Sequence, residues 1–233
     1  MSSNSFRFQQ FEVFHDQCGM KVGTDAVLLA AWVDPAHALR ILDVGTGSGL
    51  IALILAQRSQ AQLVGVELDP SAFEQASSNV LHSPWSDRVK VVQHDFTTFS
   101  DEPFDLIVSN PPFFQQSLQA PTAARNKARH DVTLTYTTLV RASAALLTQN
   151  GRFAVVLPHS SAEAFEAICW DSKLFLKRSC AVSAKSGGQP NRILMEFSTV
   201  ENVIERSTLF LMSADGGRSE AYSSLTYDLY LRP

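Results

Sequence analysis

The regular part of the sequence begins at a glycine-rich stretch, Asp43-Val44-Gly45-Thr46-Gly47-Ser48-Gly49. A short apolar run, Leu39–Asp43, leads into this stretch, and the amphipathic pattern Ser48–Arg58 follows it. We therefore expect a strand, a tight turn and a helix in direct succession. Glycine suits such a turn because it adopts backbone conformations that bring the main chain close to a ligand.

The spacing of the glycines and the acid in front of them favour one class of ligand. The dinucleotide-binding turn G-x-G-x-x-G has its third glycine three positions after the second, where this chain has Leu50. A carboxylate two residues before the first glycine suits an amine or a cation better than a phosphate. S-adenosylmethionine carries an α-amine and a sulfonium but no phosphate. The stretch therefore favours S-adenosylmethionine over NAD or a purely structural turn, with a predicted binding set of Asp43, Gly45, Gly47 and Gly49.

Strands and helices alternate along most of the chain. Beyond the first strand, the pattern predicts strands at Leu63–Glu67, Val89–Gln93, Phe104–Ser109, Gly151–Leu157, Leu174–Ser183, Arg192–Val200 and Thr208–Met212. The pattern also predicts helices at Thr24–Trp32, with Thr24 as its N-cap, and at Pro70–Leu81, Thr135–Leu147, Ser161–Trp170 and Tyr222–Leu229. Such alternation builds a parallel sheet with helices on both faces. We predict one α/β, Rossmann-like domain over residues 1–233, with a seven-stranded, mainly parallel sheet whose last hairpin supplies the antiparallel strand.

Acidic residues stand at the ends of the two strands that follow the glycine-rich stretch. Glu67 ends one strand, where a carboxylate can accept both hydroxyls of a ribose. Asp95 follows the next strand and can accept from an adenine amine, while Phe96 or its backbone borders the ring. Each acid alone is compatible with an ordinary surface position, but together, beside this turn, they predict a nucleoside site.

The fourth strand runs directly into Asn110-Pro111-Pro112-Phe113. Ligands bind at this end of the strands in a parallel sheet. A conjugated NH2 group is a poor nucleophile, and two acceptors that capture its hydrogens turn its lone pair toward an electrophile. The Asn110 side chain and the Pro111 carbonyl are suited to this task, because the prolines fix the backbone. Phe113 can stack on a planar substrate, so these residues form the predicted catalytic motif for methylation of an amine.

Basic residues gather in the loop after this motif, at Arg125, Lys127, Arg129 and His130. We predict that they contact phosphates beside a flipped base; a solvated loop is the alternative. The other candidates for RNA contact are Lys177, Arg178, Lys185 and Arg192.

The overall composition limits the other classes of function. The net charge is −4, so any contact with nucleic acid must come from a local patch. Three widely spaced cysteines indicate neither a disulfide framework nor a zinc site, and we expect no metal. No signal peptide and no membrane span is evident, which predicts a cytoplasmic protein. We expect it to be a monomer.

The order of these motifs resembles the class I amino-methyltransferases. The N-terminal Phe8-x-x-Phe11-x-Val13-x-His15-Asp16 and Met20-Lys21-Val22-Gly23-Thr24-Asp25 resemble more narrowly the bacterial tRNA(Val) adenine-N6 methyltransferase family, over nearly the whole chain. This resemblance implies tRNA as the partner and N6 of the adenine 3′ of the anticodon as the acceptor. It also implies that residues 1–38 form an extension over the cofactor, with Thr24 and Asp25 accepting from its amine and Lys21 meeting its carboxylate. A helix cap alone is the competing interpretation of these three residues.

One departure keeps related functions open. The family motif often ends in tyrosine, whereas this chain has Phe113, which keeps the stacking ring and loses a hydroxyl. Asn-Pro-Pro-Phe also occurs in ribosomal-RNA guanine-N2 methyltransferases, which is the first alternative. Release-factor glutamine methylation is the second, although only about 38 residues precede the first strand. DNA adenine methylation and cofactor binding without catalysis are further alternatives, disfavoured by the lack of a recognition insertion and by the intact motif.

Overall fold

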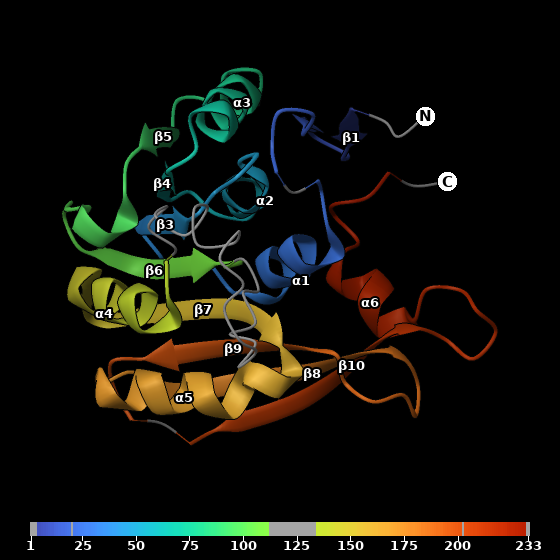
Figure 1. Cartoon of the computed structure of the whole chain (residues 1–233). Coiled ribbons are helices and arrows are strands. Elements are labelled where there is room, and N and C mark those ends of the chain that lie inside the picture. The colour runs from blue at the N-terminus through green and yellow to red at the C-terminus, as the bar shows by residue number, and fades with distance from the viewer. Residues whose placement is uncertain (1–3, 20, 112–133, 202, 232–233) are drawn as a thin grey trace, which may run out of the picture.

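The computed structural model describes residues 4–19, 21–111, 134–201 and 203–231. An eight-stranded sheet forms the centre of the molecule, in the order β10-β8-β9-β7-β6-β3-β4-β5. Figure 1 shows this sheet with helices on either side of it. The strands are β3 (Arg40–Val44), β4 (Gln62–Glu67), β5 (Val89–Gln93), β6 (Phe104–Ser109), β7 (Leu147–Pro158), β8 (Phe175–Lys185), β9 (Arg192–Ser198) and β10 (Glu205–Met212).

The predicted mainly parallel sheet is confirmed, with one strand more than expected. Strands β5, β4, β3, β6 and β7 run parallel to one another. Strand β9 runs antiparallel to both β7 and β8, so the last hairpin does supply the antiparallel strand. The eighth strand is β10, which begins earlier than the predicted Thr208 and adds parallel to β8 at the edge of the sheet.

Two hydrophobic clusters lie on opposite faces of the sheet. One face is covered by α1 (Thr24–Trp32), α2 (Leu50–Arg58) and α3 (Pro70–Leu81), and the other by α4 (Tyr136–Leu146) and α5 (Ala162–Asp171). A short α6 (Glu220–Leu225) packs with the first group. The predicted N-cap of α1 was wrong by one residue, because Gly23 is the cap and Thr24 is the first helical residue.

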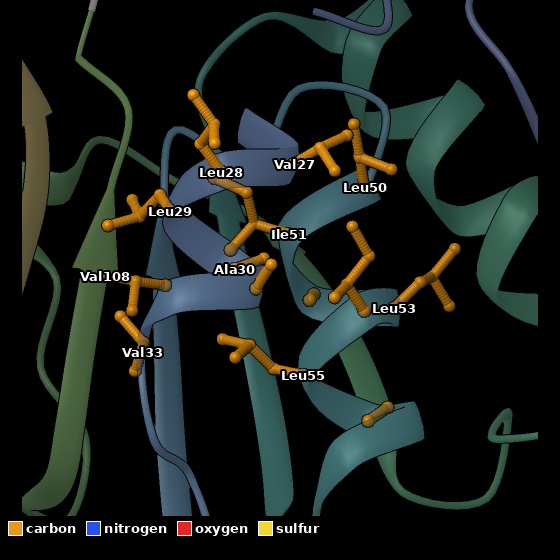
Figure 2. Close-up of a cluster of buried hydrophobic side chains, with 14 of the residues drawn as sticks. Val27, Leu28, Leu29, Ala30, Val33, Leu50, Ile51, Leu53, Leu55 and Val108 are labelled. Atoms are coloured by element: carbon orange, nitrogen blue, oxygen red, sulfur yellow. The ribbon is translucent and has the colours of Figure 1, made fainter. Parts of the chain in front are cut away.

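Helices α1 and α2 are buried on nearly all sides. Every residue of α2 from Leu50 to Ala56 is buried, and so are Val27 to Ala31 of α1. Figure 2 shows these side chains packed against one another and against Val108 of β6. A helix that is apolar all round belongs inside a protein, so α1 fixes the N-terminal segment firmly against the sheet.

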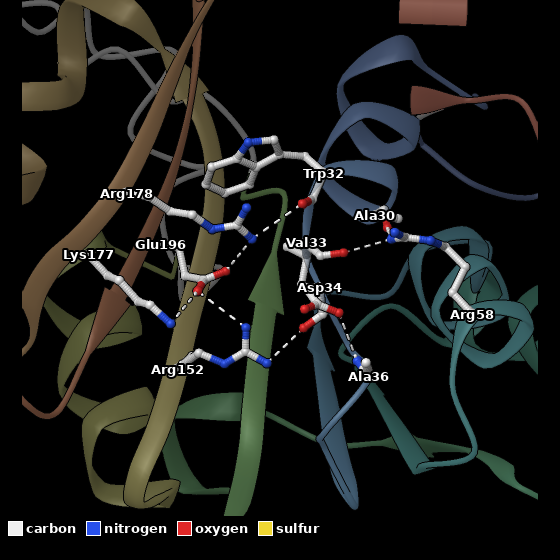
Figure 3. A network of polar contacts seen from close by, with 10 residues as sticks. All are labelled: Ala30, Trp32, Val33, Asp34, Ala36, Arg58, Arg152, Lys177, Arg178 and Glu196. Carbon is white, nitrogen blue, oxygen red and sulfur yellow. Dashed lines mark hydrogen bonds and ion pairs between the residues drawn. The ribbon is translucent and has the colours of Figure 1, made fainter. Parts of the chain in front are cut away.

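A buried ion network holds the C-terminal end of α1 (Figure 3). The Glu196 carboxylate on β9 is 0% exposed and binds Arg152 at 3.2 Å and Arg178 at 2.8 Å. The same two arginines donate to main-chain carbonyls of Asp34 and Trp32. Helix carbonyls at a C-terminus lack partners within the helix, so these contacts dock the end of α1 onto β7 and β8.

The N-terminal segment also forms a small sheet of its own. Strands β1 (Ser5–Arg7) and β2 (Glu12–Phe14) pair antiparallel. The Gln9 side chain, in the turn between them, donates to the carbonyls of Tyr227 and Tyr230. The two ends of the chain are therefore bound to each other beside α1 and α6.

Candidate functional site

The glycine turn lies between β3 and α2, where the sequence predicted it. Gly45, Gly47 and Gly49 have φ values of +68°, +58° and +82°, a region that residues with a side chain rarely adopt. A Cβ added to Gly45 or Gly47 would meet no atom within 4 Å, whereas at Gly49 it would contact Ala76 of α3. The first two glycines thus present bare main chain to open space, and the third packs the turn against α3.

Asp43 lies directly beneath this turn and is buried. Its Oδ2 accepts from the Thr46 hydroxyl at 2.6 Å and from the Ala52 N–H at 3.2 Å. Its Oδ1 has no hydrogen-bond partner among the described residues. Burial raises the pKa of Asp43 to about 7 against the opposing effect of these two bonds. A buried carboxylate with an unused oxygen is suited to a cationic partner.

Thr46 has a role that the sequence analysis missed. Besides its bond to Asp43, it packs tightly on β4, where a Cβ added to Gly65 would come within 2.9 Å of its Oγ1. The absence of a side chain at Gly65 therefore makes room for Thr46. An apolar strand interrupted by one glycine is a sign of such a close approach.

Glu67 ends β4 and reaches across to the glycine turn. Its Oε2 accepts the Gly47 N–H at 2.8 Å, and its Oε1 accepts the N–H groups of Leu68 and Asp69 at 2.9 and 3.0 Å. Three main-chain donors thus hold this partly buried carboxylate in place. The structure brings Glu67 and the turn together, as predicted.

Asp95 and Phe96 follow β5, the neighbour of β4. The Asp95 carboxylate accepts the Thr97 N–H at 2.8 Å and begins a short 3-10 helix, Phe96–Thr98. The Phe96 ring is buried in the core on the α4 side. The sequence predicted that either the ring or the main chain of Phe96 would border an adenine. Because the ring is buried in the core, the main chain is the better candidate.

Asn110 and Pro111 lie at the same edge of the sheet as the glycine turn. Ser109 ends β6 in register with Val44 of β3, and its hydroxyl donates to the Val44 carbonyl at 3.0 Å. Asn110 follows immediately and is partly buried, and Pro111 is buried. The predicted Pro112 and Phe113, and the predicted RNA contacts Arg125, Lys127, Arg129 and His130, lie outside the described residues.

Lys21, Thr24 and Asp25 are the cofactor contacts predicted in the N-terminal segment. Asp25 lies in the first turn of α1, and its Oδ2 accepts from Nε of Arg192 at 2.7 Å. This ion pair joins α1 to the start of β9. Lys21 and Thr24 are exposed. The structure therefore gives Asp25 a partner within the chain and assigns Arg192, a predicted RNA contact, to it.

The other predicted basic contacts differ in what they touch. Lys177 and Arg178 both face Glu196, because β8 bulges between Leu176 and Arg178 and places two consecutive side chains on one face. Lys185, at the end of β8, is exposed.

Comparisons with known proteins identify the family of this chain. Residues 12–167 match the model of the methyltransferase small domain family. The chain is 42% identical to the tRNA1(Val) (adenine(37)-N6)-methyltransferase of Bacteroides fragilis strain YCH46, covering 100% of both chains. It is 44% identical to the protein of the same name from Bacteroides thetaiotaomicron, with 99% of each chain covered. The chain belongs to this methyltransferase family.

The fold is that of the class I methyltransferases, as predicted. A predicted O-methyltransferase from Agrobacterium tumefaciens superposes with a TM-score of 0.70 over 88% of this chain and 96% of its own, at 20% identity. A methyltransferase from Pyrococcus furiosus gives a TM-score of 0.57 at 16% identity, over 75% of this chain and 81% of its own. As a member of this family, the enzyme uses S-adenosylmethionine as its cofactor.

The site fits this cofactor on the evidence of its own residues. The turn offers bare main chain at two glycines, Asp43 keeps one buried oxygen without a partner in the described part of the chain, and Glu67 is fixed beside the turn.

Within residues 4–231, where described, no group of three metal-ligating side chains is found. No described helix is long and apolar enough to cross a membrane.

Proposed function

We propose that this enzyme transfers the methyl group of S-adenosylmethionine to N6 of an adenine in tRNA, at the adenine 3′ of the anticodon in tRNA(Val). The position of Asn110-Pro111 supports this proposal, since these residues, which would begin the amine-binding motif, follow β6, and β6 lies beside β3 and the glycine turn. The names of the relatives that match over the full length support the choice of adenine and tRNA over guanine or a protein glutamine.

The residues of the glycine site would hold the cofactor. The turn at Gly45 and Gly47 would receive its methionine part against bare main chain. Glu67 would accept the ribose hydroxyls, Asp95 the adenine amine, and the unused oxygen of Asp43 would face the α-amine. When bound, S-adenosylmethionine supplies a methyl group made electrophilic by the neighbouring sulfonium.

The motif after β6 would activate the acceptor. The amine of an adenine has two N–H donors and a lone pair delocalised into the ring. The Asn110 side-chain carbonyl and the Pro111 main-chain carbonyl would each accept one hydrogen bond from these N–H groups. The nitrogen then becomes more tetrahedral, and its lone pair turns toward the methyl group. Proline fixes the main chain, so these acceptors are held in position before the base arrives.

A methyl-transfer assay tests the proposed substrate directly. The purified enzyme and labelled S-adenosylmethionine are incubated with total RNA and, separately, with the protein fraction from a strain lacking this gene, and the RNA nucleosides are identified by mass spectrometry. We expect new N6-methyladenosine in tRNA(Val). Label only in ribosomal RNA, as methylguanosine, would overturn the substrate but keep the chemistry. Label only in protein would replace the RNA substrate with a glutamine amide.

A further inference from the structure

Two buried amide side chains on α3 hold a remote segment of main chain. Gln75 and Asn79 are four residues apart and therefore share one side of the helix. Their exposed fractions are 6% and 2%. Buried amides need hydrogen-bond partners, and both find them in residues 14–17 of the N-terminal segment, which begin at the last residue of β2.

Asn79 binds three main-chain groups from two segments. Its Nδ2 donates to the Phe14 carbonyl at 2.8 Å, and its Oδ1 accepts the Phe14 N–H at 3.0 Å. These two bonds reproduce the contacts that a neighbouring strand would make. Nδ2 also donates to the carbonyl of Ser48 at 2.9 Å, inside the glycine turn. One side chain thus joins the N-terminal segment to the glycine turn.

Gln75 extends this contact by one turn of the helix. Its Oε1 accepts the Gln17 N–H at 2.9 Å. The next residue, Cys18, lies in the field of the Glu67 and Asp69 carboxylates, which add to the effect of burial in raising the pKa of its thiol to about 11. Together the two amides hold residues 14–17 along one side of α3, next to the glycine turn that Asn79 also contacts. On the same face of α3, Ala76 packs against Gly49.

We propose that Gln75 and Asn79 are positioning residues for S-adenosylmethionine: they hold residues 14–18 against the glycine turn and make this segment one wall of the cofactor site. This inference rests on the cofactor residues proposed above. Neither amide needs to touch the cofactor. Each acts through main chain that it fixes, Asn79 through Phe14 and Ser48, Gln75 through Gln17.

Replacing Asn79 would release the segment and disturb the turn together. Asn79→Ala leaves the N–H and carbonyl of Phe14 and the carbonyl of Ser48 without their partner. Gln75→Met keeps the volume and removes the acceptor for Gln17. We expect the Kd of S-adenosylhomocysteine to rise about tenfold for Asn79→Ala and about threefold for Gln75→Met. Glu74→Ala, on the exposed side of the same helix, is the matched control and should leave the Kd unchanged.

Alkylation of Cys18 provides a readout that does not depend on activity. Cys18 is partly exposed, whereas Cys169 and Cys180 are buried and report global unfolding. In the wild-type protein, S-adenosylhomocysteine should slow iodoacetamide labelling of Cys18, followed by mass spectrometry. In Asn79→Ala, Cys18 should react at least about fivefold faster, while the other two thiols stay protected.

Calorimetric titration of S-adenosylhomocysteine into the same samples completes the test. Faster Cys18 labelling together with a raised Kd supports the proposal. Faster labelling with an unchanged Kd overturns it, and so does unchanged labelling. If Asn79→Ala does not fold, Gln75→Met is held to the same criteria. Because no RNA enters these measurements, failure of the proposed tRNA substrate would leave their outcome intact.

Discussion

The N–H of Gly47 donates to Oε2 of Glu67 at 2.8 Å, and this bond joins the ends of two neighbouring strands. Gly47 belongs to the turn after β3, and Glu67 is the last residue of β4. The other oxygen of Glu67 is held by the N–H groups of Leu68 and Asp69. The carboxylate is therefore fixed by main chain, without help from a ligand. Preorganisation of this kind lowers the entropy lost on binding.

Glu67→Gln tests the importance of this arrangement. The substitution places an NH2 group against a main-chain donor and removes the charge that would accept from a ribose. Hydrogen bonds to charged groups contribute about 1.5–3 kcal/mol, so we expect S-adenosylhomocysteine to bind roughly 10- to 100-fold more weakly. Calorimetry measures the Kd, with the exposed Asp87→Asn as control. Wild-type affinity in Glu67→Gln would rule out the assigned role.

Asp43 should make stability depend on pH. Its carboxyl titrates near 3.8 when unfolded and at about 7 when folded, because burial disfavours the charged form. The folded state thus binds more protons between pH 4 and 7, and the free energy of unfolding falls as pH rises through that window. Asp43→Asn does not titrate and can still accept from Thr46 and Ala52. Its stability relative to wild type should therefore increase from pH 4 to pH 7, by more than about 1.4 kcal/mol.

The same substitution should weaken cofactor binding. An amide cannot offer a negative charge to the α-amine, so the Kd of S-adenosylhomocysteine should rise even though the stability of the variant relative to wild type is greater at pH 7 than at pH 4. Urea unfolding and calorimetry on one preparation measure both effects. If the free energies of unfolding of Asp43→Asn and wild type differed by the same amount at every pH, the raised pKa of Asp43 would be contradicted.

Gly65→Ala should disturb the site from the neighbouring strand. The new Cβ would lie 2.9 Å from Oγ1 of Thr46 and 3.0 Å from its Cβ, closer than real contacts allow. Thr46 must then move away from Asp43. Overpacking of this kind costs about 1–3 kcal/mol, and we expect a comparable drop in the free energy of unfolding together with weaker cofactor binding. Gly19→Ala, whose Cβ meets nothing within 4 Å, is the control, and equal behaviour of the two variants would refute the packing argument.

The Glu196 network should matter for stability. Glu196→Ala leaves Arg152, Arg178 and Lys177 facing one another at a site where the carboxylate is fully buried. Breaking a buried ion pair from one side costs about 3–5 kcal/mol. Urea unfolding should show a loss of that size, against little change for the exposed Glu205→Ala on β10. A loss below about 1 kcal/mol would mean that the arginines find other partners.

The positions of the glycine turn, Glu67 and Asp95 on the sheet could be predicted because their signals are local. The glycine turn, Glu67 and Asp95 each follow a short apolar strand, and parallel strands bring their ends to one edge. Strands β5 and β6 and helix α3 begin and end at the predicted residues. Here the hydrophobic pattern, the turn residues and the helix start all agreed.

Contacts between segments that are far apart in the sequence could not be predicted from the hydrophobic pattern. Helix α6 stops at Leu225, short of the predicted Leu229, because the following residues pair with the N-terminal hairpin; the Leu229 carbonyl accepts the Gln9 N–H. Gln75 and Asn79 look like ordinary polar positions on an amphipathic helix. Only the fold shows that their partners, at residues 14, 17 and 48, lie on that side.

The rate of N6-methyladenosine formation by Asn110→Ala tests the central claim most directly. The rate is measured on tRNA(Val) at saturating S-adenosylmethionine, with calorimetry of S-adenosylhomocysteine on the same sample. The exposed Asn191→Ala, after the β8–β9 turn, serves as the control. Loss of one preorganised polar contact to the reacting group typically costs about 100- to 1,000-fold in rate. We predict a loss of that size with cofactor affinity within twofold of wild type, and a wild-type rate in Asn110→Ala would contradict the proposed activation of the amine.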